Sequence, residues 1–160
     1  MIQFKSLLSS LESNHVQFVI IGGVAATLHG AARVTFDLDI VYERTPENLN
    51  KLVDALSPFE PYLRGAPLGL PFKFDAETLR RGLNFTFTTT EGPIDLLGEL
   101  LGVGSYSDVV AHSVEALLFG ASYRFLDLEA LLASKRAAGR PKDLAQLPLI
   151  RATAAVRKRL

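Results

Sequence analysis

The sequence predicts a mixed α/β (α+β) domain in which helices flank a mixed β-sheet. Short apolar runs rich in β-branched residues, such as residues 18–21, alternate with segments whose apolar residues recur at helical spacing, such as residues 45–57. The 160 residues are 48% hydrophobic and 21% charged, which is enough apolar material for one domain with its own core. We therefore expect a single domain over 1–160, with a core at about 1–125 and a C-terminal helical segment at about 126–160.

Local signals place the elements of the first part of the chain. Apolar residues at helical spacing predict a helix over 2–11, ahead of the apolar strand 18–21. The Gly22-Gly23 pair ends that strand and begins a short helix, and His29-Gly30 ends the helix because glycine is favoured just past a helix C-terminus. Thr45-Pro46-Glu47 begins the next helix, with proline at its first position and an acid in its first turn.

The rest of the chain predicts hairpins followed by helices. The proline- and glycine-rich stretch 58–73 is expected to be a loop with at most a short strand. Asp75 and Asp127 are candidate N-caps. The elements expected after 73 are a short helix over 75–82, a hairpin of strands 84–90 and 93–97, a hairpin of strands 114–119 and 123–125, a helix from 127 to about 140 and a last helix from 141 whose Leu144, Leu147 and Ile150 face inward.

Two aspartates share one face of an expected strand. Over 35–42, apolar residues alternate with Asp37 and Asp39. Neighbouring carboxylates repel each other unless a cation lies between them, and Mg²⁺ prefers hard oxygen ligands of this kind, with Mn²⁺ as an alternative ion. The pair therefore predicts half of a divalent metal site. The other interpretation is a half-buried edge strand with a solvated acidic face.

Gly22-Gly23 lies one helix upstream of the acidic pair. Glycine allows backbone N–H groups to approach an anion closely, and a helix N-terminus favours negative charge. A phosphate cradle ahead of an acidic strand favours the metal site over the solvated face.

This string resembles the DNA polymerase β-like nucleotidyltransferase superfamily, whose signature is an apolar strand, Gly-Gly or Gly-Ser, a short helix and then Asp-x-Asp on the next strand. Gly22-Gly23 and Asp37-Leu38-Asp39 match that signature over the first quarter of the chain. The version most similar to this one occurs in bacterial abortive-infection (AbiEii-type) nucleotidyltransferases, on the basis of Ala25, His29-Gly30, Arg33 and Thr35. The resemblance implies a nucleotidyltransferase-type fold, with nucleotide-binding roles for Gly22, Gly23, Arg33 and Thr35 and metal ligation by Asp37 and Asp39.

Asp95 stands between Ile94 and Leu96 in a strand-like run. An acid in that position is costly to bury without a partner. The superfamily takes a third carboxylate from a later strand, so the resemblance implies that Asp95 ligates the metal or activates the attacking hydroxyl. A surface-facing Asp at a strand end is the other interpretation, and Glu99 is a weaker candidate for the role.

Charge is distributed unevenly although the formal net charge is +0. From Lys135 onward there are eight Lys or Arg residues against one acid, Asp143. This basic segment predicts either folding back over an acidic cleft or a basic face for a polyanion. The resemblance to the abortive-infection enzymes implies that Lys135 contacts the triphosphate and that Asp143 orients it or holds basic partners. A helix C-terminus decorated with bases for its dipole is the alternative.

Several function classes are disfavoured by composition and motifs. Cysteine is absent, which excludes disulfides and thiolate zinc sites and fits a cytoplasmic protein. No stretch reaches the ~18 apolar residues of a membrane span, and the N-terminus has no signal pattern. His15, His29 and His112 have no matching partners for a histidine metal site, and neither a Gly-x-Ser-x-Gly motif nor a Walker phosphate loop is present.

The predicted activity is Mg²⁺-dependent transfer of an NMP from a nucleoside triphosphate, ATP or another NTP, to a hydroxyl acceptor. The acceptor is an RNA end, a small molecule or a protein side chain, and the resemblance suggests a toxin–antitoxin or phage-defence setting with a cognate partner protein. The alternative is a non-catalytic module that keeps the fold and binds a nucleotide, RNA or a partner. Three intact acids, Asp37, Asp39 and Asp95, favour catalysis.

Overall fold

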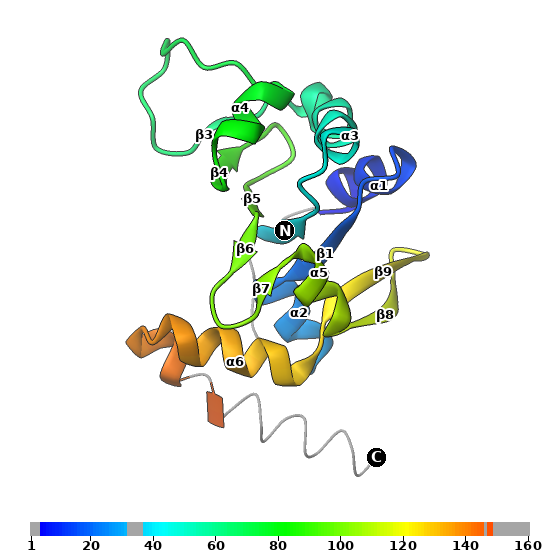
Figure 1. The fold of residues 1–160 in the computed structure, drawn as a ribbon, viewed down its shortest axis with the longest axis vertical. Helices are drawn as coiled ribbons and strands as arrows, with labels where there is room; N and C mark the ends of the chain where they lie inside the picture. Colours follow the sequence, from blue (N-terminus) through cyan, green and yellow to red (C-terminus); the bar gives the residue numbers. More distant parts are fainter. Residues whose placement is uncertain (1–3, 32–36, 146, 149–160) are drawn as a thin grey trace.

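The computed structural model describes residues 4–31, 37–145 and 147–148 (Figure 1). Its elements in chain order are α1 (Lys5–Ser13), β1 (Phe18–Ile21), α2 (Gly22–Leu28), β2 (Leu38–Tyr42), α3 (Pro46–Leu56), the 3-10 turn η1 (Ser57–Phe59), β3 (Tyr62–Leu63), α4 (Ala76–Arg81), β4 (Asn84–Thr88), β5 (Ile94–Leu97), β6 (Glu99–Leu100), β7 (Gly104–Ser105), α5 (Tyr106–Ala111), β8 (Ser113–Leu118), β9 (Ala121–Leu126) and α6 (Leu128–Ala138). Residues 141–145 are also helical. The alternation of helices and strands confirms the predicted mixed α/β class.

Seven strands form the main sheet in the order β3-β4-β5-β2-β1-β9-β8, and β6 pairs with β7 separately. The pairs β2–β5 and β1–β9 are parallel, and the other four pairs of the main sheet are antiparallel. The two predicted hairpins are present as β4–β5 and β8–β9. The central position of β2, between β1 and β5, brings the ends of three strands together where the aspartates lie.

Alternation along the strands divides the core into two clusters. Ile20, Ile40 and Leu96 project into a cluster with the leucines of α1, α3 and α4. Val19 and Val41 project to the opposite face, into a cluster with residues of α2, α5 and α6. In Figure 1, α1, α3 and α4 lie in the upper part of the view and α2, α5 and α6 in the lower part. Asp39 lies between Leu38 and Ile40 in sequence, and it therefore shares the face of Val41, toward α6.

Side-chain caps begin the two longest helices at the predicted starting points. The Thr45 side chain accepts a hydrogen bond from Asn48 N at the start of α3, where Pro46 occupies the first turn. The Asp127 side chain accepts from Ala130 N at 2.8 Å at the start of α6. Gly139 ends α6 in the left-handed conformation, with φ of 66°. These caps set where α6 begins and ends, and so which of its residues face the sheet.

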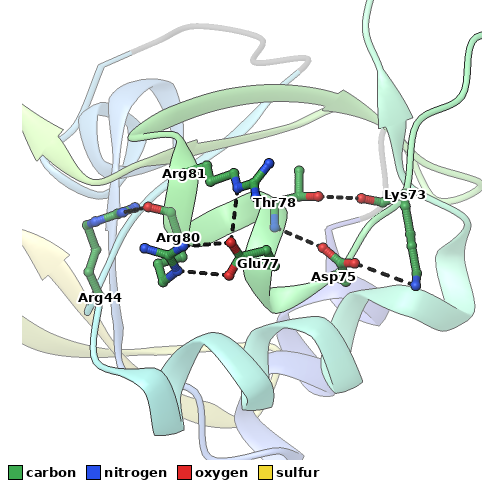
Figure 2. Close-up of polar contacts among 7 residues, drawn as sticks. All are labelled: Arg44, Lys73, Asp75, Glu77, Thr78, Arg80 and Arg81. Atoms are coloured by element: carbon green, nitrogen blue, oxygen red, sulfur yellow. Dashed lines mark hydrogen bonds and ion pairs between the residues drawn. The ribbon is translucent and has the colours of Figure 1, made fainter.

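Polar contacts hold the short helix α4 at both ends (Figure 2). The Asp75 side chain accepts from Thr78 N at 2.8 Å, which confirms the predicted N-cap. Glu77 pairs with Arg80 and Arg81 on the exposed side. At the C-terminal end the Arg44 guanidinium donates to the carbonyls of Leu79 and Arg80. A six-residue helix is thus anchored to the end of β2.

One segment with secondary structure carried no prediction. Residues 99–111 form the small β6–β7 hairpin and α5, in which Asp108 accepts a hydrogen bond from Ser105 N at 3.1 Å. The Ser105-x-x-Asp108 spacing is a helix-start signal that would have located α5. Val109 of α5 packs in the second cluster, beside the sheet face that bears Asp39.

The last predicted helix is present, but part of its orientation was predicted wrongly. Leu147 is buried, whereas Leu144 is 46% exposed. The inward face is instead shared by Asp143 and Leu147, which are four residues apart and so lie one above the other on a helix. Ile150 and the basic cluster Arg157-Lys158-Arg159 lie outside the described residues. In the described part of the chain, every helix is too short or too polar to cross a membrane.

Candidate metal and nucleotide site

The sheet places Asp39 and Asp95 side by side. β2 and β5 are parallel neighbours, and in their register Asp39 is the direct partner of Asp95. Asp37 lies immediately before β2, two residues from Asp39. One carboxylate oxygen from each of Asp37, Asp39 and Asp95 lies within 4.8 Å of the other two. The three acids singled out in the sequence therefore form one cluster, and Asp95 faces the pair instead of the opposite side of the sheet.

Gly22 closes the cluster from β1. Ile21 pairs with Asp39 across β1 and β2, so the turn after β1 lies over the Asp39 carboxylate. Gly22 has φ of 64°, and a Cβ added there would overlap Asp39 Oδ2. Only glycine both adopts this backbone conformation readily and leaves room for the carboxylate. The glycine turn and the aspartate strand are thus in direct contact.

Burial and crowding change the acidity of Asp39. Its pKa is raised from 3.8 to about 8, mainly by burial and further by the contact with the Asp95 carboxyl and the charges of Asp95 and Asp37. The charge of Arg64 opposes them. At neutral pH without a cation, the Asp39 carboxyl therefore holds a proton.

Arg64 is a member of the cluster that the sequence did not reveal. It follows the two-residue strand β3, and its Nη2 lies 2.7 Å from Asp95 Oδ1. The two side chains form an ion pair, but the geometry is not that of a hydrogen bond, and Asp95 Oδ1 accepts no hydrogen bond from the described residues. No local pattern marks Arg64, since its position depends on the pairing of β3 with β4.

The cluster fits a divalent cation. Asp39 Oδ1 and Asp95 Oδ1 are buried atoms that accept no hydrogen bond within the described ranges. Such atoms are costly unless something satisfies them. Carboxylate oxygens are the ligands that Mg²⁺ and Mn²⁺ prefer, and one divalent ion would use the lone pairs that the protein leaves unused.

A cavity of about 270 Å³ adjoins the cluster at Gly22. Its walls come from the end of β1, from β4 to β6, and from α6 and the helical residues after it, including Lys135, Arg140 and Asp143. The C-terminal helices therefore cover the face of the sheet that carries the aspartates. This arrangement agrees with the predicted position of the C-terminal segment.

Lys135 and Asp143, predicted to act together, form an ion pair. Lys135 Nζ lies 3.8 Å from Asp143 Oδ1, and Arg140 donates to both Asp143 oxygens. Asp143 is only 2% exposed. Burial alone would raise its pKa, but the hydrogen bonds from Arg140 and the charges of Arg140, Lys135 and Lys142 outweigh burial and keep the pKa below the usual value. One anion thus holds two cations at the cavity wall.

The remaining candidate residues have structural roles, lie away from the aspartate cluster or lie outside the described residues. Arg33 and Thr35 lie outside the described residues. His29 bonds through Nε2 to the Leu126 carbonyl at 2.8 Å, which ties α2 to the end of β9. His112 lies 3.9 Å from Asp127 on the surface, away from the aspartate cluster. Glu99 lines the cavity wall but is not part of the three-carboxylate cluster.

Two solved structures have folds similar to that of this chain. A candidate nucleotidyltransferase of Thermotoga maritima is similar, with a TM-score of 0.60 over 91% of this chain and 88% of that one, at 14% sequence identity. The chain has the nucleotidyltransferase fold. The antibiotic-resistance factor ANT(2'')-Ia is also similar, with a TM-score of 0.54 at 14% identity, covering 96% of this chain and 88% of that one. No family model and no curated protein matches the sequence.

Within this fold, the abortive-infection subtype stays a prediction. At 14% identity the likeness concerns the arrangement of the nucleotidyltransferase fold and does not extend to a substrate. The evidence for function therefore lies in the aspartate cluster, the Gly22 turn and the adjoining cavity.

Proposed function

We propose that this chain is a metal-dependent nucleotidyltransferase that moves an NMP from a nucleoside triphosphate to a hydroxyl acceptor. The observation that carries the proposal is the cluster of Asp37, Asp39 and Asp95 directly under the Gly22 turn. Three crowded carboxylates, two with buried oxygens that accept no hydrogen bond from the described residues, are unfavourable in a protein that only needs to fold. They are useful in a protein that binds a divalent cation beside a phosphate chain.

The roles follow from position. Asp37, Asp39 and Asp95 would hold Mg²⁺, or Mn²⁺, which when bound offsets phosphate charge and lowers the pKa of the acceptor hydroxyl. Gly22 and Gly23 offer backbone N–H groups to the phosphates at the start of α2. Lys135 faces the adjoining cavity, where its charge suits the triphosphate, and Asp143 positions it. For Arg33 and Thr35, the proposed contacts with the nucleotide rest only on the resemblance to the nucleotidyltransferase superfamily.

The chemical step is an in-line displacement at the α-phosphorus. The acceptor oxygen forms a new bond to that phosphorus, the bond to the bridging oxygen of the β-phosphate breaks, and pyrophosphate leaves. A carboxylate of the cluster, Asp95 in this proposal, takes the proton of the acceptor hydroxyl. The protein's contribution is mainly positioning and charge, as is general for this class of reaction.

Label transfer tests the proposal and identifies the acceptor. The protein is incubated with Mg²⁺, a cell extract and each triphosphate labelled at the α-phosphate, with γ-labelled samples in parallel. We expect transfer of α-label but not of γ-label to RNA, protein or a small molecule. Transfer of γ-label would indicate a kinase. Mg²⁺-dependent nucleotide binding without any transfer would favour the non-catalytic module. We extend the proposal to a toxin–antitoxin or phage-defence role with a partner protein. An acceptor in RNA or protein would support this role.

Lys135→Ala separates nucleotide binding from folding. Removal of the ammonium should weaken triphosphate affinity by about 10- to 150-fold, because one charge-assisted contact to phosphate is worth about 1.5–3 kcal/mol. Stability should fall by less than the roughly 3–5 kcal/mol of a broken buried ion pair, since Arg140 still donates to both Asp143 oxygens. Equilibrium dialysis and urea unfolding measure the two effects. Arg136→Ala, on the exposed side of the same helix, is the control. Lost stability with unchanged nucleotide binding would make Lys135 a structural residue.

A further inference from the structure

Arg64 is held in place from two directions. Its backbone N–H donates to the Thr86 carbonyl at 3.0 Å, which continues the pairing of β3 with β4. Its Nη2 donates to the Phe87 carbonyl at 2.8 Å. The same nitrogen reaches the Asp95 carboxylate, and the two side chains are only 30% and 20% exposed. The guanidinium is therefore fixed to β4 and directed at the cluster.

The charges of the cluster explain why a fixed cation matters there. Ionised carboxylates that lie within 4.8 Å of one another repel, and Arg64 adds a positive charge 2.7 Å from one of them, Asp95. Removal of Arg64 would take this counter-charge away from Asp95 and so strengthen the repulsion between Asp95 and its neighbouring carboxylates. Asp95 Oδ1 accepts no hydrogen bond from the described residues, so at this oxygen the ion pair with Arg64 is the contact that restrains the carboxylate.

We infer that Arg64 is a positioning residue, a built-in counter-ion that keeps Asp95 in the cluster before metal binds and limits the affinity of the empty site for free divalent cations. The inference rests on the proposed function. A cation held 2.7 Å from one ligand repels a second cation at the same cluster. Mg²⁺ should therefore bind well only when it arrives with the triphosphate, whose negative charge offsets that repulsion.

Manganese titrations of the metal-free protein test the charge effect. Free Mn²⁺, measured by electron paramagnetic resonance without nucleotide, should bind Arg64→Gln at least about threefold more tightly than wild type. The gain arises because the Coulomb repulsion removed exceeds the entropy of fixing one Asp side chain. Arg64→Lys keeps the charge and should stay within about twofold of wild type. Arg124→Gln removes an arginine paired with Glu115 at 3.3 Å on the β8–β9 hairpin and should change nothing.

Arg64→Gln affinity equal to or weaker than wild type would overturn the inference. A second measurement needs no metal: a double-mutant cycle of Arg64→Gln and Asp95→Asn in urea unfolding. The inference predicts a clear coupling, with Asp95→Asn rescuing most of the stability that Arg64→Gln loses, and additive effects would contradict it. If wild type binds no Mn²⁺ even with triphosphate, the proposed function fails, while the cycle still decides the counter-ion role of Arg64.

Discussion

Asp39→Asn should abolish divalent cation binding and nucleotidyl transfer while making the metal-free protein more stable at pH 8. Loss of residues that merely support metal ligands costs 10–100-fold in affinity, so loss of a ligand should cost at least about 100-fold. Asn keeps the shape of the side chain and removes a negative charge from a crowded cluster. Activity assays and Mn²⁺ titrations measure the loss, and thermal unfolding measures the gain in stability.

The pH dependence of stability gives this variant a distinctive signature. The Asp39 pKa is about 8 in the folded protein, against 3.8 for an aspartate freely exposed to water, so between these values the folded protein binds the extra proton. Stability therefore falls as pH rises from about 4 to 8, by on the order of 2 kcal/mol, because solvent screens part of the charge effect at this half-buried carboxyl. Asp39→Asn should flatten that part of the profile. A variant that is less stable than wild type at pH 8, or that keeps full activity, would contradict the assignment.

Gly22→Ala should disable the site by a different route, through the backbone. An alanine at φ of 64° costs about 1–2 kcal/mol, and its Cβ would also overlap Asp39 Oδ2 and displace the carboxylate. We expect a further loss of about 1–3 kcal/mol from that overlap and a fall of at least about tenfold in Mn²⁺ affinity. Urea unfolding and Mn²⁺ titration measure the two losses.

Gly120 provides the matched control for this substitution. It lies in the β8–β9 turn with φ of 80°, and a Cβ there would meet nothing within 4 Å. Gly120→Ala therefore carries the same backbone penalty without the overlap, and its metal affinity should equal that of wild type. Equal losses in the two variants would mean that the glycine turn does not constrain Asp39.

The acidic cluster could be predicted from the sequence because side chains along a strand alternate between its two faces with a regular period of two residues. Alternation placed Asp37 and Asp39 on one face, and the isolation of Asp95 between apolar residues indicated a partner across the sheet. The glycine turn, the helix start at Thr45-Pro46-Glu47 and the caps Asp75 and Asp127 were likewise local signals. Such signals depend on residues a few positions apart in the sequence, so they can be recognised without knowledge of the tertiary structure.

The errors and omissions arose where tertiary contacts override local pattern. Helical spacing of apolar residues predicted Leu144 inside, but the ion pairs of Asp143 with Lys135 and Arg140 turn the acid inward instead. Arg64 carries no local signal, because its contact with Asp95 needs β3, β4 and β5 to be assembled first. A two-residue strand cannot be recognised from its own sequence.

Anomalous scattering from crystals grown with Mn²⁺ and a non-hydrolysable triphosphate analogue tests the central claim most directly. The account predicts a manganese peak bound by oxygens of Asp37, Asp39 and Asp95 at about 2.0–2.2 Å, with the phosphate chain against Gly22 and toward Lys135. A crystal that holds the nucleotide elsewhere, with no manganese at the three carboxylates, would contradict it.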